Sequence, residues 1–417
     1  MLDLRLIRRD PDAVRAALAR RGDDGRLDEV LTLDEDWRAA TATAEGLRAE
    51  QKAASEEIAK AKRAGEDAGP ALERMREMSA EVKSLTERAR SAEERLQAAL
   101  ASLPNLPDPT AAPQDTVIRE VGEPRIREGR DHLALAGRRI DMERGARLSG
   151  SRFAYLRGEL VMLELALVRW ALEKLQGYGF EPVIPPVLVR EHALYGTGFL
   201  PDTEQQIYRL PEDDLYLAGT SEVALASMHA GEILDGSELP LRYAGFSPCF
   251  RREAGAAGKD TRGIFRVHQF DKVEMFAFVE PEQSPDEHER LLSIEEEILR
   301  DLEVPYRVVN IAVDDLGSSA AKKYDCEAWL PGQSRYRELT STSNTTDFQA
   351  RRLEIRYRPQ PGARPEVLHT LNGTAVAVGR TMIALLENGQ REDGSVKLPD
   401  VLVPYGAPSE LPPADPL

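Results

Sequence analysis

A heptad repeat between residues 30 and 103 constrains the fold of this chain more than any other feature. Mostly apolar residues recur there at alternating spacings of three and four, on both sides of the Gly- and Pro-containing segment 65–70. The first run is Val30, Leu33, Trp37, Ala40, Ala44, Leu47, Gln51, Ala54, Ile58 and Ala61, and the second is Met75, Met78, Val82, Leu85, Ala89, Ala92, Leu96, Ala99 and Leu103. This spacing forms the seam of a coiled coil, so we predict two long helices that fold into an antiparallel hairpin. At ~1.5 Å per residue each helix would reach roughly 50–60 Å.

The charges of this hairpin are unevenly distributed. Acidic residues crowd its base, whereas its tip carries Lys60, Lys62, Arg63, Arg74 and Arg76. The whole chain has 55 Lys and Arg against 72 Asp and Glu, a net charge of −17, which disfavours general affinity for nucleic acid. Periodicity alone is more typical of a dimerisation or spacer coiled coil, but a cationic tip on an acidic protein favours a local contact with RNA.

Composition divides the chain into segments. Residues 1–103 are predicted to form a helical domain, with a short helix that begins at Asp10-Pro11 before the hairpin. The proline-rich segment 104–130 should end the second long helix and act as a stiff linker. Residues 131–406 show the mixed helix and strand pattern of an α+β domain. The proline-rich tail 407–417 is expected to be disordered.

Cysteine usage and hydropathy indicate the compartment. Cys249 and Cys326 are too few for a disulfide framework and have no metal-binding spacing, so we expect a cytoplasmic protein without structural zinc. The most apolar segment, residues 159–175, is interrupted by charged residues, among them Glu164, Arg169 and Glu173, so we expect no membrane span.

A predicted strand at residues 248–253 carries the first candidate site residues. Alternation along a strand places Arg251 and Glu253 on one face and Arg252 on the other, so a cation and a carboxylate point into the same space. An isolated Arg-x-Glu is more often a solvated surface strand. Here a polar, Gly-rich loop follows it, AGAAGKDTRG, which contributes the further cations Lys259 and Arg262.

A second predicted strand, at residues 264–278, follows that loop. Phe270 and Glu274 are four residues apart and therefore share a face, which offers a ring for stacking on a base and a carboxylate for an ammonium group. Together the two strands predict a site for a phosphate, an aromatic base and an amine.

Three other stretches combine charges with hydroxyl groups. In LAGTSEVA, Thr220, Ser221 and Glu222 are explained by a helix cap alone. In the string from Tyr336 to Leu353, Glu338 stands among many Ser and Thr residues; a Ser/Thr-rich loop is one reading, but a carboxylate beside hydroxyls also suits Mg²⁺. Arg380 begins an apolar helix after a strand, where a buried guanidinium needs an anionic partner.

These stretches closely resemble the motifs of the class II aminoacyl-tRNA synthetases in their seryl form. FRREAG, DTRG and HQFDKVE are similar to motif 2, the string 336–353 to a seryl-specific motif, and residues 370–388 to motif 3. A predicted helix at 154–176 and the proline-containing strand after it resemble motif 1, with Pro186 at a dimer interface. The resemblance covers nearly the whole chain. It implies a coiled-coil tRNA-binding arm, then a catalytic domain with an antiparallel sheet flanked by helices.

The resemblance also implies roles for individual residues. For ATP it implies Arg251, Arg252, Glu253, Val267, Phe270, Glu338, Leu339, Thr340, Ser341 and Arg380, with Mg²⁺ held by Glu338 and Ser341. For serine it implies Thr220, Ser221, Glu222, Arg251, Glu274, Asn372 and Thr374. Arg251, Glu253 and Arg380 are the implied catalytic residues. For tRNA it implies the five basic residues of the hairpin tip.

The implied activity is activation of L-serine with ATP to seryl-adenylate, followed by transfer to tRNA(Ser), and also to tRNA(Sec), by a homodimer. A related ligase that loads an amino acid onto a carrier protein is the nearest alternative, but such proteins are not expected to keep a long RNA-binding arm. A coiled-coil interaction protein with an inactive nucleotide fold is a further alternative, which the retained Arg251, Glu253, Glu338 and Arg380 disfavour.

Overall fold

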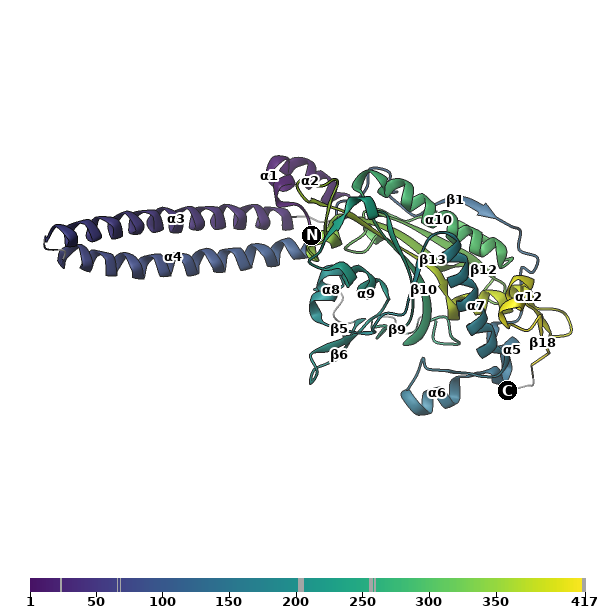
Figure 1. Ribbon diagram of the computed structural model, residues 1–417. Helices are drawn as coiled ribbons and strands as arrows, with labels where there is room; N and C mark the ends of the chain where they lie inside the picture. Colours follow the sequence, from purple (N-terminus) through teal and green to yellow (C-terminus); the bar gives the residue numbers. More distant parts are fainter. Residues whose placement is uncertain are drawn as a thin grey trace. The chain divides into compact units, whose positions relative to one another are not determined.

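The computed structural model describes residues 1–22, 25–65, 67, 69–201, 206–254, 258 and 260–414. The chain forms two compact units: Leu2–Pro104, and Asn105–Leu417 together with Met1. Figure 1 shows the elements of both, and each unit is described by itself. Within the described residues, no helix is long and apolar enough to cross a membrane.

The first unit is helical. It consists of α1 (Leu4–Arg9), α2 (Pro11–Ala19), α3 (Arg26–Ala64) and α4 (Gly69–Ser102). As predicted, α2 begins at Pro11, and the Asp10 side chain caps it by accepting a hydrogen bond from the Ala13 N–H at 3.1 Å. The preceding helix α1 was not predicted. Arg8 on α1 binds the buried Asp34 carboxylate on α3 at 2.5 and 3.0 Å, which fixes these two helices together.

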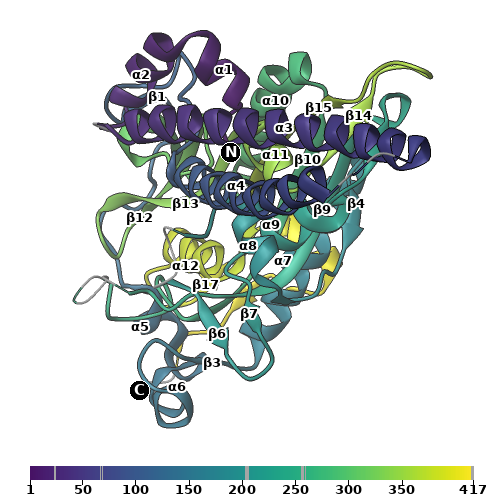
Figure 2. The ribbon, with the colours of Figure 1, turned by 90° about the vertical axis from the view of Figure 1, so that its left-hand side faces the viewer.

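The hairpin prediction is confirmed. Helices α3 and α4 lie side by side along their length in both views (Figures 1 and 2). Every predicted seam position from Val30 to Leu103 is buried or half-buried, while most positions between them are exposed. Helix α3 ends at Gly65, whose φ of +76° is a left-handed conformation that favours glycine.

The second unit is built on an eight-stranded sheet. The strand order is β1 (Thr116–Val121), β11 (Tyr306–Asn310), β12 (Lys322–Leu330), β13 (Arg335–Thr346), β16 (His369–Ala377), β10 (Gln269–Val279), β9 (Leu241–Phe250) and β4 (Glu181–Val183). All neighbours are antiparallel except β4 and β9. The expected α+β architecture with an antiparallel sheet is therefore confirmed.

Alternation along the central strand β10 separates two apolar layers. Met275, Ala277 and Val279 pack with α7 (Glu159–Gly177), α10 (Ser284–Asp301) and α12 (Val378–Gly389), and α10 lies along β13 and β16. Phe276 and Phe278 point to the opposite face, into a second cluster. Because side chains alternate, Phe270, Lys272 and Glu274 share the face of these two phenylalanines.

The remaining elements are shorter. They are α5 (His132–Ala136), η1 (Gly137–Arg139), β2 (Ile140–Asp141), α6 (Met142–Ser149), β3 (Tyr155–Leu156), β5 (Leu188–Val189), α8 (Glu191–Thr197), β6 (Tyr208–Leu210), β7 (Leu215–Leu217), α9 (Glu222–Ala226), η3 (Ser227–His229), β8 (Ile233–Asp235), η4 (Gly236–Glu238), η5 (Pro281–Gln283), η6 (Val313–Asp315), α11 (Phe348–Arg352), β14 (Arg356–Arg358), β15 (Glu366–Val367), β17 (Val396–Lys397), η7 (Asp400–Tyr405) and β18 (Glu410–Leu411).

Two predicted segment boundaries are wrong. The interval 104–130 was predicted as a stiff linker, but from Asn105 it belongs to the second unit. It contains the edge strand β1, which Arg119 ties to Glu296 on α10 by two contacts of 2.9 and 2.7 Å. The tail is not disordered from residue 407, since β18 pairs with β17 and the Leu411 side chain is buried. Residues 415–417 of that tail lie outside the described part.

Several predicted element limits also differ from the structure. The first site strand ends at Phe250, because Glu253 has a φ of +50°, which a strand does not accept. The second begins only at Gln269, because residues 264–265 turn into the apolar core. Helix α7 begins at Glu159 rather than at residue 154, since Gly158 with a φ of +59° precedes it.

Candidate active site

A cleft of about 590 Å³ opens on the face of β10 that carries Phe270 and Glu274. It is lined from the end of β9, from β10, β13 and β16, and from the start of α12. Strands distant in sequence thus contribute side chains to one space. A second hollow, of about 630 Å³, lies near the ends of α10 and α12 and is lined by none of the predicted site residues.

The motif 2 residues meet at one end of this cleft. The Arg251 guanidinium lies 5.3 Å from the centre of the Phe270 ring, and its Nε donates to the Gly219 carbonyl at 3.0 Å. Glu253 also lines the cleft, but its carboxylate is paired with Arg266 at 2.5 Å. Val267 lies on the same wall. The cleft therefore presents a cation beside an aromatic face, which suits a phosphate next to a base.

A β-bulge brings the predicted metal ligands together. Glu338 and Ser341 are three residues apart, so regular alternation would place them on opposite faces of β13. The pairing of β12 with β13 shifts at this point: Cys326 lies opposite Thr340, whereas Glu327 lies opposite Glu338, so Leu339 is an extra residue. As a result both Glu338 and Ser341 line the cleft.

The charged groups around Glu338 are already paired with one another. Arg380 Nη1 lies 3.2 Å from Glu338 Oε1 and donates to its carbonyl oxygen at 3.0 Å. Desolvation opposes ionisation of Glu338, but the charges of Arg380, Lys323 and Arg251 outweigh it and hold the pKa of Glu338 below its ordinary value. A carboxylate kept ionised beside a hydroxyl is a donor set that fits Mg²⁺.

Lys323 and Asp325 form a second pair beside it. They lie opposite Ser343 and Ser341 in the register of β12 with β13, and their charged groups are 3.1 Å apart. Burial raises the pKa of Asp325 to about 7, although the positive charge of Lys323 opposes this shift. Lys323 lines the cleft and adds a cation that was not predicted.

At the other end, buried polar groups surround Glu274. Thr220 Oγ1 donates to Glu274 Oε2 at 2.7 Å, and the Lys272 ammonium contacts Glu274 and lies 2.8 Å from Thr220 Oγ1. Thr374 lies directly opposite Glu274 in the register of β10 with β16. This pocket therefore already holds one ammonium group against its carboxylate, which is the interaction expected for an amino-acid substrate.

Glu222 completes the pocket. Its Oε1 accepts hydrogen bonds from Gln349 Nε2 at 2.7 Å and from Asn372 Nδ2 at 2.9 Å. Burial, together with the negative charge of Glu274, raises the pKa of Glu222 to about 7. The carboxyl group therefore changes its charge near neutral pH.

Two predicted site residues lie outside the cleft. Arg252 is exposed and does not line the cleft. Ser221 is buried behind the cleft, 3.2 Å from the position of a Cβ on Gly245. The other predicted ATP and serine residues, including Leu339 and Thr340, line it. Lys259 lies outside the described residues.

The structure adds Lys272, Lys323 and Arg266 to the site. Lys272 could have been found from the sequence, because it lies between Phe270 and Glu274 at the alternate positions of one strand. Lys323 and Arg266 carried no such signal, since each is brought in by strand pairing or by a turn.

The predicted RNA-binding residues lie on the arm. Lys60, Lys62 and Arg63 lie on the last turns of α3, Arg74 and Arg76 on the first turns of α4, and all five are exposed. Within the described part of the arm, none of them is paired with a carboxylate.

Comparisons with known proteins agree along the chain. Residues 206–389 match the model of the tRNA synthetase class II core domain (G, H, P, S and T), and residues 1–107 match the Seryl-tRNA synthetase N-terminal domain. The serine–tRNA ligases of Nocardia farcinica and Streptomyces coelicolor are each 53% identical, over 97% of this chain and 98% and 97% of their own. A crystal structure of seryl-tRNA synthetase from Pyrococcus horikoshii complexed with ATP has a TM-score of 0.94 at 43% identity and covers all of both chains.

Proposed function

Because this chain belongs to the seryl-tRNA synthetases, we propose that the residues of its cleft carry out the two steps of serine–tRNA ligation. The protein is an ATP-dependent serine–tRNA ligase of class II. The geometry of the cleft supports a role for each of its side chains.

We assign the phosphate and adenine end to the motif 2 and motif 3 residues. Arg251 contacts the α-phosphate and the serine carboxylate, and the adenine ring stacks beside Phe270 with Glu253 and Val267 at its edge. Arg380 exchanges its Glu338 partner for the γ-phosphate. Glu338 and Ser341 would hold Mg²⁺, which offsets charge on the phosphate oxygens. Arg252 is left out because it is exposed outside the cleft.

We assign the other end to serine. The serine ammonium binds Glu274 and Thr220, in the place where the Lys272 ammonium makes its contacts. Thr374, opposite Glu274, and Asn372 surround the short side chain and its hydroxyl. Serine and threonine differ by a methyl group, which this pocket can reject only by lack of space.

The chemistry then needs positioning and charge stabilisation rather than a protein nucleophile. A serine carboxylate oxygen attacks the α-phosphorus, the bond to pyrophosphate breaks, and Arg251 stabilises the charge that develops. In the second step a terminal ribose hydroxyl of the tRNA attacks the seryl carbonyl carbon, and AMP leaves.

The observation that carries these assignments is the convergence of Arg251, Glu274, Glu338 and Arg380 on one cleft. Arg251→Ala or Arg380→Ala should lower serine-dependent pyrophosphate exchange into ATP at least ~100-fold, the scale for losing a positioned charge donor. The matched control is Arg252→Ala, which removes the same charge from the neighbouring, exposed position. Near-parental exchange in Arg251→Ala or Arg380→Ala would remove that residue from the mechanism.

For the second substrate we propose tRNA(Ser), and in addition tRNA(Sec), with the arm as the binding element. The arm's exposed basic tip on an acidic chain supports this, since it concentrates positive charge at one place. A carrier-protein ligase would not need it. Charging assays with transcripts of each tRNA test the assignment, and failure to charge tRNA(Sec) would restrict the substrate to tRNA(Ser).

We further propose a cytoplasmic homodimer. Val161, Met162 and Leu165 on α7 are exposed apolar side chains, and Ile184, close to Pro186 after β4, is 80% exposed. Such an apolar face suits burial against a second copy. Sedimentation at micromolar concentration should give the mass of two chains, and a monomer there would contradict the proposal. The free, buried Cys249 and Cys326 fit a reducing compartment.

A further inference from the structure

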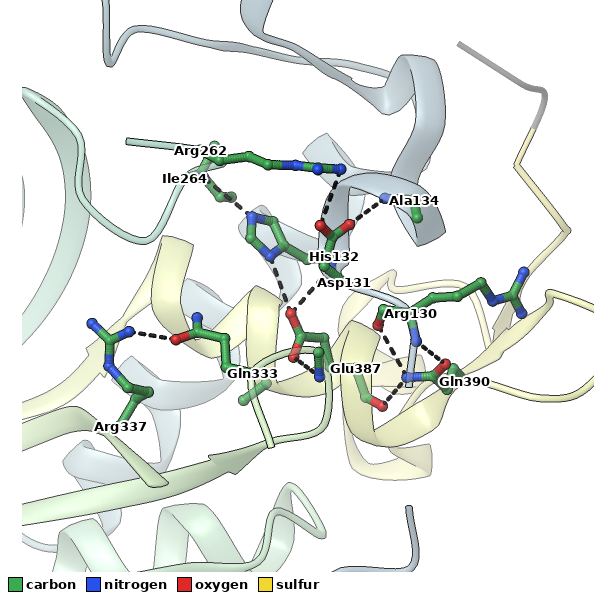
Figure 3. Close-up of polar contacts among 12 residues, drawn as sticks. Arg130, Asp131, His132, Ala134, Arg262, Ile264, Gln333, Arg337, Glu387 and Gln390 are labelled. Atoms are coloured by element: carbon green, nitrogen blue, oxygen red, sulfur yellow. Dashed lines mark hydrogen bonds and ion pairs between the residues drawn. The ribbon is translucent and has the colours of Figure 1, made fainter. Parts of the chain in front are cut away.

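Glu387, near the end of α12, is a fully buried carboxylate that receives three N–H groups. Its Oε1 accepts from the backbone N–H of His132 at 3.1 Å and lies 3.1 Å from His132 Nδ1, and its Oε2 accepts from the Gly332 N–H at 2.9 Å. A buried charge needs such partners to remain in the fold. Figure 3 shows Glu387 between His132 and the turn before β13.

His132 also binds the motif 2 loop. The backbone N–H of Ile264 donates to His132 Nε2 at 3.2 Å, so the ring proton lies on Nδ1 and is donated to Glu387. Gly263 makes the approach possible, because a Cβ there would lie 2.0 Å from Nε2, and its φ is +79°. The histidine thus bridges α12 to the residue at which the loop re-enters the core (Figure 3).

Two ion pairs hold the same part of the loop. Arg262 lies 3.1 Å from Asp131, the residue before His132, and Asp260 binds Arg337 on β13 at 2.9 and 2.8 Å. Figure 3 shows Arg262 facing Asp131. Both ion pairs are more exposed than the hydrogen bonds that link Glu387, His132 and Ile264. We therefore expect the ion pairs to contribute less to the rigidity of this loop.

Phe265, the residue after Ile264, connects these hydrogen bonds to the cleft. Two guanidinium groups lie over the Phe265 ring: that of Arg337 is 3.9 Å from the ring centre and that of Arg380 is 4.7 Å from it. The Phe265 carbonyl oxygen is 3.5 Å from Arg380 Nε. Arg380 and Glu387 are two helical turns apart on the same face of α12. The contacts therefore form a closed ring that starts and ends on one helix.

We infer that His132 and Glu387 are positioning residues for ATP: they fix Ile264 and Phe265, and Phe265 in turn orients the Arg380 guanidinium. This inference rests on the proposed role of Arg380. It predicts an effect on the KM for ATP and none on the KM for serine, because Glu274, Thr220 and Lys272 are not part of the ring.

Two substitutions at one position separate the hydrogen bond from the packing. In His132→Asn the amide reaches the place of Nδ1 and can still donate to Glu387, but it is too short to accept from Ile264. In His132→Gln the side chain reaches the place of Nε2 and offers an oxygen to that N–H. We expect the Asn variant to raise the KM for ATP about 10-fold, the scale of one lost buried hydrogen bond, and the Gln variant to restore most of it.

The matched control is His229→Asn. His229 is also hydrogen-bonded through both nitrogens, to Glu232 at 2.7 Å and Tyr243 at 2.9 Å, but lies outside the cleft lining. It should lower the Tm without changing the KM for ATP. Gly263→Ala provides a second route, since its Cβ would force residue 263 and the His132 ring apart without substituting His132 or Glu387, and it should raise the KM for ATP as well.

The outcomes distinguish this inference from the proposed function. If Arg380→Ala raises the KM for ATP while folded His132→Asn and Gly263→Ala do not, the positioning role is wrong and the proposed function stands. If Asn and Gln at position 132 raise the KM for ATP equally, the Ile264 contact is not what matters, and the inference is also wrong. If Arg380→Ala itself leaves ATP use unchanged, the proposed role of Arg380 is wrong, and the inference that rests on it is wrong as well.

Discussion

Removing the positive charge of the arm tip should weaken RNA binding without affecting serine activation. The perturbation replaces all five exposed cations with glutamine: Lys60, Lys62, Arg63, Arg74 and Arg76. Glutamine keeps helix propensity close to that of lysine and arginine, so the coiled coil should persist. Serine-dependent pyrophosphate exchange should be unchanged, because the exchange chemistry is assigned to the cleft of the other unit.

The geometry of the hairpin limits how many of these cations one RNA can meet. Successive residues on a helix are rotated by about 100°, so the neighbours of a seam residue lie on opposite sides of the hairpin. Lys60 and Lys62 flank the seam residue Ala61, and Arg74 and Arg76 flank the seam residue Met75. One flat face of the hairpin therefore receives one cation from each of these two pairs, and Arg63 on the outer edge is a third.

Each phosphate that a cation neutralises adds ~0.7–0.9 to the log–log slope of tRNA affinity against salt, so removing about three such cations should make this slope shallower by about 2–3. Fluorescence anisotropy with tRNA(Ser) between low and physiological salt measures the slope. The control removes the same charge from exposed positions of the shaft: Arg48, Lys52, Lys83, Arg88 and Arg95. Equal slopes in the tip variant and the parent, or equal changes in tip and shaft variants, would refute the assignment of the tip.

Two further predictions concern the serine pocket. The pKa of Glu222 is raised to about 7, so this carboxyl becomes ionised as pH rises through that value. Because ionisation adds a negative charge to the pocket proposed to bind the serine ammonium, the KM for serine should fall between pH 6 and 8. Glu222→Gln should flatten this change. Because a raised carboxyl pKa costs the ligand-free fold stability above the ordinary pKa, Glu222→Gln should also gain Tm relative to the parent more at pH 8 than at pH 6; identical pH profiles would contradict both. Thr374→Ala should raise the KM for serine roughly 5–10-fold and narrow the preference for serine over alanine, and an unchanged preference, measured by exchange with each amino acid, would place the hydroxyl contact elsewhere.

The arm was predictable because its fold depends on local periodicity. Seam residues from Val30 to Leu103 pack as their spacing requires, and a helix pair needs no distant partner to define which face is buried. The site strands were predictable for the same reason where alternation is regular. Phe270 and Glu274 share a face, as expected, since β10 pairs with β9 without a shift.

Residue positions at irregular points of the backbone could not be predicted from alternation or periodicity. Alternation places Glu338 and Ser341 on opposite faces, and only the extra residue Leu339 brings both into the cleft. The positive φ of Glu253 ends the extended conformation from which its place beside Arg251 was predicted, although both residues line the cleft. Both features depend on strand pairing and on backbone turns, for which this sequence carries no local signal. They occur at the cleft, where deviations from regular structure are expected to serve function.

The ionic pairs of the cleft explain how so many charges remain compatible with folding. Arg380 is paired with Glu338, Lys272 with Glu274 and Lys323 with Asp325, so each of these six groups has an opposite charge close by. An unpaired charge in a confined site would cost several kcal/mol. ATP brings anionic phosphate groups and serine brings an ammonium group, and these carry the same signs of charge as the partners that these residues already contact. Ligand binding therefore replaces an ion pair within the protein with one between the protein and the ligand. Selectivity then depends on how well a ligand replaces the internal partner rather than on net attraction to the cleft.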